Sequence, residues 1–81
     1  MRLYFTNDSR QKKLISESDY VEDLYDEMIM FFDDHHKYPH FIEANIEDSV
    51  IKIEFGSDTE YFYIDSDDED ILDEFMELLE E

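Results

Sequence analysis

Between residues 41 and 64, apolar residues alternate with mostly polar ones at the two-residue period of β-strands. Three such stretches follow one another, and the segments 47–49 and 56–59 between them have the composition of tight turns. Gly56, the single glycine, stands in the second turn, where a positive φ is expected. The pattern predicts a three-stranded antiparallel meander. Its apolar face is formed by Ile42, Ala44, Ile46, Ile51, Ile53, Phe55, Phe62 and Ile64.

The opposite face of this meander carries aromatic side chains with acidic neighbours. Its members are Phe41, Glu43, Val50, Lys52, Glu54, Tyr61 and Tyr63. An exposed aromatic patch with an acidic rim is typical of a protein-binding surface or an oligomer contact. Alternatively, the N-terminal segment covers this face, and the sequence pattern favours neither arrangement.

Residues 19–35 have the apolar spacing of an amphipathic helix. We expect Ser16 or Ser18 to cap its N-terminus, where acidic residues also suit the helix dipole. The helix cannot extend far beyond Lys37, because Pro39 disfavours helical geometry in the residue before it. The apolar stripe of this helix consists of Val21, Leu24, Met28 and either Phe31 or Phe32.

A second amphipathic helix is predicted over residues 66–81. Ser66 and Glu69 have the spacing of a capping box, in which each side chain bonds an exposed amide at the helix start. The apolar face of this helix consists of Ile71, Leu72, Phe75, Leu78 and Leu79. Outside this face, every residue after Asp67 is acidic except Met76, which lies at the border of the face.

The N-terminal region completes the predicted architecture. Residues 3–6 alternate as a short strand does, and the polar, basic segment 7–13 is predicted to be a loop that supplies counter-charge to the acidic body. Leu14 and Ile15 are expected to dock on the core before the first helix. The order is strand, helix, three strands, helix. We therefore predict one α+β domain over residues 1–81, a two-layer sandwich with both helices on the apolar sheet face.

Charge limits the function classes. The chain has 25 acidic and 6 basic residues and a formal net charge of -19. Such a surface repels nucleic acid and anionic membranes and attracts basic proteins. Because 42% of the residues are hydrophobic, disorder does not explain the charge. Without cysteine, a signal-peptide core or a membrane-length apolar run, the protein is expected to be soluble and cytoplasmic.

No residue set has the spacing of a catalytic or metal site. His35, His36 and His40 lie close together, but Pro39 prevents a regular helix from presenting them on one side. A calcium loop beginning at Asp65 would lack the glycine and the final bidentate glutamate. No nucleophile elbow, phosphate loop or zinc motif is present. We expect a binding protein that is not an enzyme and needs no metal or cofactor.

The predicted helices carry acidic residues at a spacing close to that of DNA phosphates. Residues 66–81 would span about 24 Å with nine acids, which is about one charge per 2.7 Å. B-DNA has one phosphate per ~3.4 Å along each strand. Solubility alone needs far less charge. The acids expected to contact a partner are Glu22, Asp26, Asp33, Asp70, Asp73, Glu74 and Glu77.

In size, acidity and helix-strand-strand-strand-helix order, residues 18–81 resemble the small phage-encoded DNA-mimic inhibitors, especially type II anti-CRISPR proteins. Acidic anti-restriction proteins and uracil-DNA glycosylase inhibitors are more distant likenesses. The additional N-terminal strand and basic segment depart from this pattern. The resemblance implies an inhibitor, in the host cytoplasm if phage-encoded, whose carboxylates occupy the basic DNA-binding site of a nuclease or other DNA-binding protein.

Two other functions fit the same charge. One is an immunity or antitoxin protein that neutralises a basic toxin, and the other is an acidic phage assembly partner. In all three cases the partner is a protein, nucleic acid and membrane are not bound directly, and the chain is a monomer or a homodimer.

Overall fold

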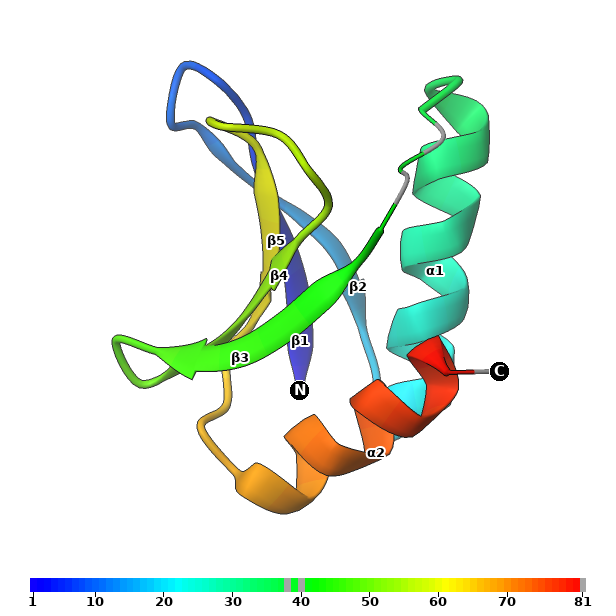
Figure 1. Cartoon of the computed structure of the whole chain (residues 1–81), viewed down its shortest axis with the longest axis vertical. Helices are drawn as coiled ribbons and strands as arrows, with labels where there is room; N and C mark the ends of the chain where they lie inside the picture. Colours follow the sequence, from blue (N-terminus) through cyan, green and yellow to red (C-terminus); the bar gives the residue numbers. More distant parts are fainter. Residues whose placement is uncertain (38, 40, 81) are drawn as a thin grey trace.

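The computed structural model describes every residue of the chain except 38, 40 and 81. Five strands form one antiparallel sheet in the order β2-β1-β5-β4-β3, and two helices pack against it (Figure 1). This confirms the predicted α+β sandwich. The elements are β1 (Arg2–Thr6), β2 (Lys12–Glu17), α1 (Val21–Asp34), β3 (Glu43–Glu47), β4 (Val50–Glu54), β5 (Tyr61–Ile64) and α2 (Glu69–Leu79).

The predicted meander is β3, β4 and β5. Ile46 pairs with Ile51 across the first hairpin, so apolar side chains of both strands share the buried face. Asp48 and Ser49 form its two-residue turn with φ angles of 54° and 65°. Two successive positive φ angles match the right-handed twist of the paired strands. Gly56 has the expected positive φ, 93°.

The N-terminal third contains a strand that the sequence pattern did not predict. β1 confirms the first strand, but Lys12 and Lys13, expected in a loop, belong to β2. Asn7 and Gln11 close the β1–β2 hairpin through the hydrogen bond from the Asn7 amide to the Gln11 carbonyl, 3.1 Å. β2 is an edge strand in which four of the six residues are exposed, so its stability comes mainly from backbone pairing with β1 and needs no apolar alternation.

A one-residue irregularity in the β1–β2 pairing explains why Ile15 packs against the core and Leu14 does not. Tyr4 pairs with Leu14 while Leu3 pairs with Ser16, which leaves Ile15 as the extra residue of β2. Ile15 packs against the core as predicted. Leu14, predicted to dock there too, is 50% exposed on the other sheet face beside Tyr4, and that prediction is wrong.

α1 begins at Val21, and the predicted serine caps are wrong. Tyr20 is the N-cap residue and supplies no capping side chain. The Ser18 hydroxyl instead accepts a hydrogen bond from the Tyr20 amide at 3.1 Å and donates one to Asp23 at 2.7 Å. Ser18 therefore shapes the turn that leads into α1. α1 ends at Asp34, before Pro39, as expected.

α2 begins at Glu69, three residues after the predicted start, so the capping box is wrong as well. The Ser66 hydroxyl accepts a hydrogen bond from the Asp68 amide, 3.2 Å, and so stabilises a turn before the helix. Asp68 is the N-cap residue, and its carboxylate accepts from the Asp70 amide at 2.9 Å. Ser66 and Asp68 both have side chains that can cap a helix, and Asp68, which is nearer the apolar stripe of α2, is the N-cap residue.

The core is centred on Phe62 of the middle strand β5. Its ring lies 5.1 to 5.7 Å, centroid to centroid, from four other phenylalanine rings. These rings come from β1, α1 and the residue that follows β4, namely Phe5, Phe31, Phe32 and Phe55. Phe75 of α2 is fully buried in the same cluster. Both helices thus bury their apolar sides on one sheet face, as predicted. Within the described residues, no helix combines the length and apolar character needed to span a membrane.

Candidate protein-binding surface

All seven acids predicted to contact a partner are exposed. On α1, Glu22, Asp26 and Asp33 lie four and seven residues apart and so return to the same side of the helix. That side faces away from the buried stripe, which includes Leu24 and Met28. Burial of the stripe fixes the rotation of α1 and therefore holds these carboxylates in solvent.

The acids of α2 are placed by the same mechanism. Asp70, Asp73, Glu74 and Glu77 are exposed, while Phe75 on the other side of the helix is fully buried. Neither helix has a basic residue in its last turn. Both helix ends therefore retain the negative potential of their carbonyl groups, which adds to that of the carboxylates.

The observed helix lengths lower the expected charge density slightly. α2 has five acids among 11 residues, so its length of about 16 Å carries about one charge per 3.3 Å. α1 has six acids among 14 residues, about one charge per 3.5 Å. The sequence-based value of about 2.7 Å for the second helix was too small, because Asp67, Asp68 and Glu80 lie outside α2 and Glu81 is not among the described residues. Both observed values are close to the ~3.4 Å phosphate spacing of a single DNA strand.

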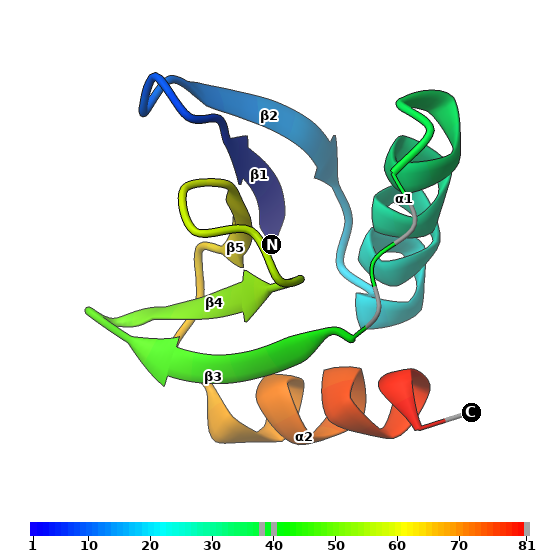
Figure 2. The same ribbon diagram turned by 45° about the horizontal axis from the view of Figure 1, so that its top comes forward.

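The two acidic helices pack against each other but are not collinear. α2 runs across the N-terminal end of α1, and the two helices point in different directions (Figures 1 and 2). Tyr25 of α1 and Phe75 of α2 form the aromatic contact between them, with ring centroids 5.9 Å apart. The structure therefore groups the predicted acids as two sets, Glu22, Asp26 and Asp33 on α1 and Asp70, Asp73, Glu74 and Glu77 on α2.

An apolar groove, which the sequence did not reveal, lies beside these acids. On α1, Ile29 and Met30 are 39% and 57% exposed and line a hollow of about 510 Å³ with Ile42. Ile42 also lines a neighbouring hollow of about 370 Å³ with Met76 of α2. Asp33 borders the first hollow. We call the surface formed by Ile29, Met30, Ile42 and Met76 the apolar groove.

The aromatic sheet face is open. Of the two arrangements that the sequence allowed, an exposed face and a face covered by the N-terminal segment, the structure has the first. β1 extends the sheet beside β5 and does not cover it, and no other described element lies over this face. Tyr4 stacks on Tyr63 with ring centroids 4.9 Å apart. Phe41 does not belong to this face, because it precedes β3 and lines a separate hollow with Gly56. We call the surface of Tyr4, Tyr61 and Tyr63 the tyrosine face.

Arg2 lies beside this face. A hydrogen bond with Tyr4, followed by the charges of Glu17 and Asp65, raises the pKa of Arg2. The ion pair between the Arg2 Nε and a Glu17 carboxylate oxygen measures 3.5 Å and is solvent-exposed, so it contributes little to stability.

The histidines after α1 form no metal site in the described part of the chain. His35 stacks on Phe31 at 4.0 Å between ring centroids, and its Nδ1 lies 3.0 Å from the Phe31 carbonyl oxygen. His36 adopts a positive φ of 53° at the helix end. His40 lies outside the described residues. Among the residues described, no group of three or more His, Asp or Glu side chains is arranged to hold a metal ion.

Comparison with known proteins gives no matching family model, no matching curated sequence and no matching solved structure. The charge and the exposed surfaces of this chain therefore carry its functional interpretation.

Proposed function

We propose that the protein is an acidic DNA-mimic inhibitor that binds the basic DNA-binding site of a nuclease or another nucleic-acid-binding protein, as anti-CRISPR and anti-restriction proteins do. The observation that carries this proposal is the placement of seven exposed carboxylates on two helices whose apolar sides are buried in the core. Their spacing along each helix is close to that of phosphates.

Rigid placement of these charges favours tight binding. A partner site that has evolved for a regular phosphate array meets carboxylates that are already positioned, so less conformational entropy is lost on association. The net charge of -19 accelerates encounter with a basic groove through long-range attraction. The partner's DNA-binding site is then blocked without any chemical reaction.

The apolar groove supplies the contacts that charge alone does not. Met30 and Met76 are exposed, flexible apolar side chains beside the acidic helices. Interfaces commonly combine a desolvated apolar centre with a polar rim, and methionine is enriched in them. An inhibitor whose binding requires both charged and apolar contacts distinguishes its target from other DNA-binding proteins.

The same groove favours an immunity or antitoxin protein as the second candidate. DNA has no counterpart of an exposed methionine side chain, so a partner that relies mainly on the groove need not bind DNA at all. In this alternative the acids steer a basic toxin to the groove, and the toxin's active site is blocked by the apolar contact.

Capture followed by competition separates the two functions. The immobilised full chain is incubated with bacterial lysate, and retained proteins are identified before and after washing with duplex DNA. The inhibitor proposal predicts a DNA-binding partner that duplex DNA releases and whose DNA cleavage or binding is inhibited by the free protein. A retained partner that saturating duplex DNA does not release and that has no affinity for DNA would support the antitoxin function instead.

A further inference from the structure

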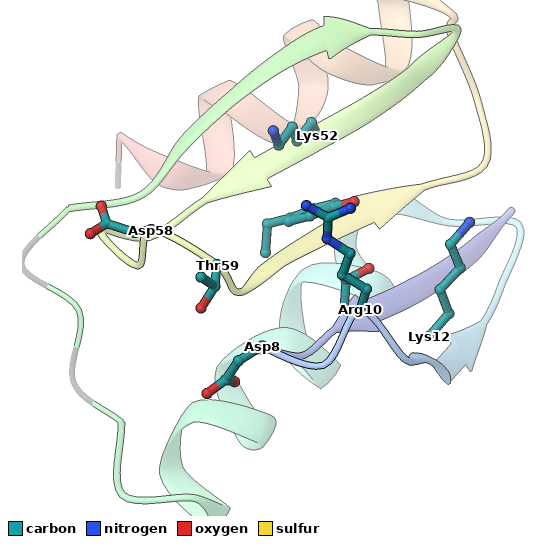
Figure 3. A pocket seen from close by; sticks show the side chains of 8 residues that line it. Asp8, Arg10, Lys12, Lys52, Asp58 and Thr59 are labelled. Carbon is teal, nitrogen blue, oxygen red and sulfur yellow. The ribbon is translucent and has the colours of Figure 1, made fainter.

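A pocket of about 430 Å³ opens on the tyrosine face, between the β1–β2 hairpin and the β4–β5 loop (Figure 3). Its volume lies within the range of pockets that hold small molecules, about 300 to 1,000 Å³. Tyr61 of β5 forms part of its wall. It is distinct from the acidic helices and from the apolar groove, so it is not explained by the proposed inhibition.

The pocket concentrates positive charge in a strongly acidic protein. Three of the six basic residues, Arg10, Lys12 and Lys52, line it. Within the described structure, Arg10 and Lys12 form no ion pair, although the chain has 25 acidic residues. Lys52 forms two loose ion pairs, 3.8 Å to Glu47 and 3.5 Å to Glu54. Two cations without an ion pair, Arg10 and Lys12, at one pocket favour an anionic ligand.

The bases are held in place by aromatic rings and by the hairpin. The Lys12 Nζ lies 5.5 Å from the centroid of the Tyr63 ring, and the Lys52 Nζ lies 4.7 Å from that of Tyr61. Arg10 adopts a φ of 61°, and its amide donates a hydrogen bond to the Asn7 carbonyl at 2.9 Å. The aromatic rings thus position the two ammonium groups without adding negative charge, and the backbone hydrogen bond stabilises the turn that carries Arg10.

Thr6 gives independent support for a ligand. Its side chain lines the pocket, its residue is only 3% exposed, and its hydroxyl has no hydrogen-bond partner in the described structure. Among the described side chains, it is the one buried polar group left unpaired. A buried hydroxyl without a partner is costly, so such groups usually have a functional explanation. Thr6 lies opposite Lys12 on β2 and Tyr61 on β5.

The two sides of the pocket differ in charge. Figure 3 shows Arg10, Lys12 and Lys52 toward one side, and Asp8 and Asp58 toward the other. Arginine and lysine together bind a phosphate group well, because its oxygens accept several charge-assisted hydrogen bonds. Carboxylates repel phosphate but accept hydrogen bonds from hydroxyl groups. The ligand therefore needs a phosphate at one end and hydroxyl groups at the other.

We propose that this pocket binds a small phosphomonoester with free hydroxyl groups, a sugar phosphate or a nucleoside monophosphate. The phosphate contacts Arg10, Lys12 and Lys52 and accepts a hydrogen bond from the Thr6 hydroxyl. The ligand hydroxyls donate to the carboxylates of Asp8 and Asp58.

NMR titration of the full chain tests the proposal in a phosphate-free buffer at ~0.15 M salt. Ribose 5-phosphate should give saturable shifts at the pocket amides, inorganic phosphate should bind more weakly, and ribose should not bind. Adenosine monophosphate distinguishes the two ligand types: tighter binding than ribose 5-phosphate identifies a nucleotide, and equal binding identifies a sugar phosphate. Absence of saturation by either phosphomonoester up to ~10 mM would overturn the proposal.

A substitution of Lys12, with a matched control at Lys13, tests the assigned phosphate contact. Lys12→Gln should raise the Kd for ribose 5-phosphate by about tenfold, the usual effect of losing a charge-assisted hydrogen bond. Lys13→Gln makes the same charge change on the neighbouring residue, which does not line the pocket, and should change the Kd by less than about twofold. Equal effects of the two would show non-specific attraction by surface charge and would overturn the site.

Thr6→Val removes the hydroxyl while keeping the shape of the side chain. It should raise the melting temperature, because an unpaired buried hydroxyl is replaced by an apolar methyl group. It should also raise the Kd for ribose 5-phosphate by about threefold or more. An unchanged Kd in this folded variant would rule out the assigned contact. The acids of α1 and α2 are untouched in every variant, so these results do not depend on the inhibitor proposal.

Discussion

Tyr25 of α1 packs against Phe75 of α2 with ring centroids 5.9 Å apart and an interplanar angle of 70°. Phe75 is fully buried, so this edge-on contact is shielded from solvent on the α2 side. The contact sets how the acidic side of one helix is placed relative to that of the other. The arrangement of the charged surface therefore depends on core packing.

Phe75→Ala should destabilise the fold by about 3–5 kcal/mol, because it removes a fully buried ring and leaves a cavity. That is a large part of the stability expected for a domain of this size. Urea denaturation followed by circular dichroism measures the change. Met76→Ala, at the neighbouring, 42% exposed position, is the control and should cost less than about 1 kcal/mol. Equal losses in the two variants would mean that α2 is not anchored through Phe75.

Asp68→Ala should destabilise the protein by about 0.5–2 kcal/mol, because the Asp68 carboxylate caps α2 through the Asp70 amide. Asp67→Ala removes the same charge from an exposed neighbour that makes no cap and is the matched control. Thermal melts of both variants give the comparison. If Asp67→Ala were the more damaging variant, α2 would begin earlier than Glu69.

Added salt should stabilise the isolated protein. A net charge of -19 creates self-repulsion in the compact state, and ions screen it. We expect the melting temperature to rise by about 5 °C or more between ~0.01 and ~0.5 M sodium chloride. Asp73→Lys with Glu77→Lys lowers the magnitude of the net charge by four, so the same titration should give a smaller rise. A melting temperature that falls with salt in the original protein would contradict this account of its electrostatics.

Met30→Asp should weaken binding to the captured partner by about tenfold or more, because it places a charge in the apolar groove. The fold should be unaffected, since Met30 is 57% exposed. Tyr20→Asp introduces the same charge at a position that is 71% exposed and outside the groove, and it should leave affinity nearly unchanged. Surface plasmon resonance compares the two. Equal affinities would show that the groove is not part of the interface.

The sequence predicted those parts of the fold that repeat with a regular period. The stripe from Val21 to Phe32 and the alternation around Ile53 are determined by burial on one side, and the structure confirms both. Burial of these stripes also explains why the exposure of the seven acids could be predicted. Whether those acids contact a partner remains a prediction.

The features that the sequence missed depend on competition or on contacts distant in the chain. Lys12 lies in a strand held by backbone pairing, which leaves no side-chain pattern. Ser66 and Asp68 both have capping side chains, and only the geometry of the turn selects between them. Met30 belongs by period to the polar side of α1 and becomes part of a groove because Ile42 packs beside it. The unpaired hydroxyl of Thr6 depends on the residues of β2 and β5 that lie opposite it, so its position in β1 gives no sign of it in the sequence.

In the proposed complex, the helix carboxylates take the place of phosphates in the partner's DNA-binding site. The most direct test of this substitution is the affinity of the captured partner for the Asp73→Lys, Glu77→Lys variant, with Glu17→Lys, Glu47→Lys as a control of equal charge change on the sheet. We expect the helix variant to fold, because both positions are exposed and a lysine at position 77, in the last turn of α2, suits the helix dipole. It should bind about 100-fold more weakly, since close charge pairs across an interface couple by ~1.5 kcal/mol or more each. The control should bind within about threefold of the original protein, because surface charges outside the contact contribute little. A folded helix variant that binds as tightly as the control would contradict this mode of binding.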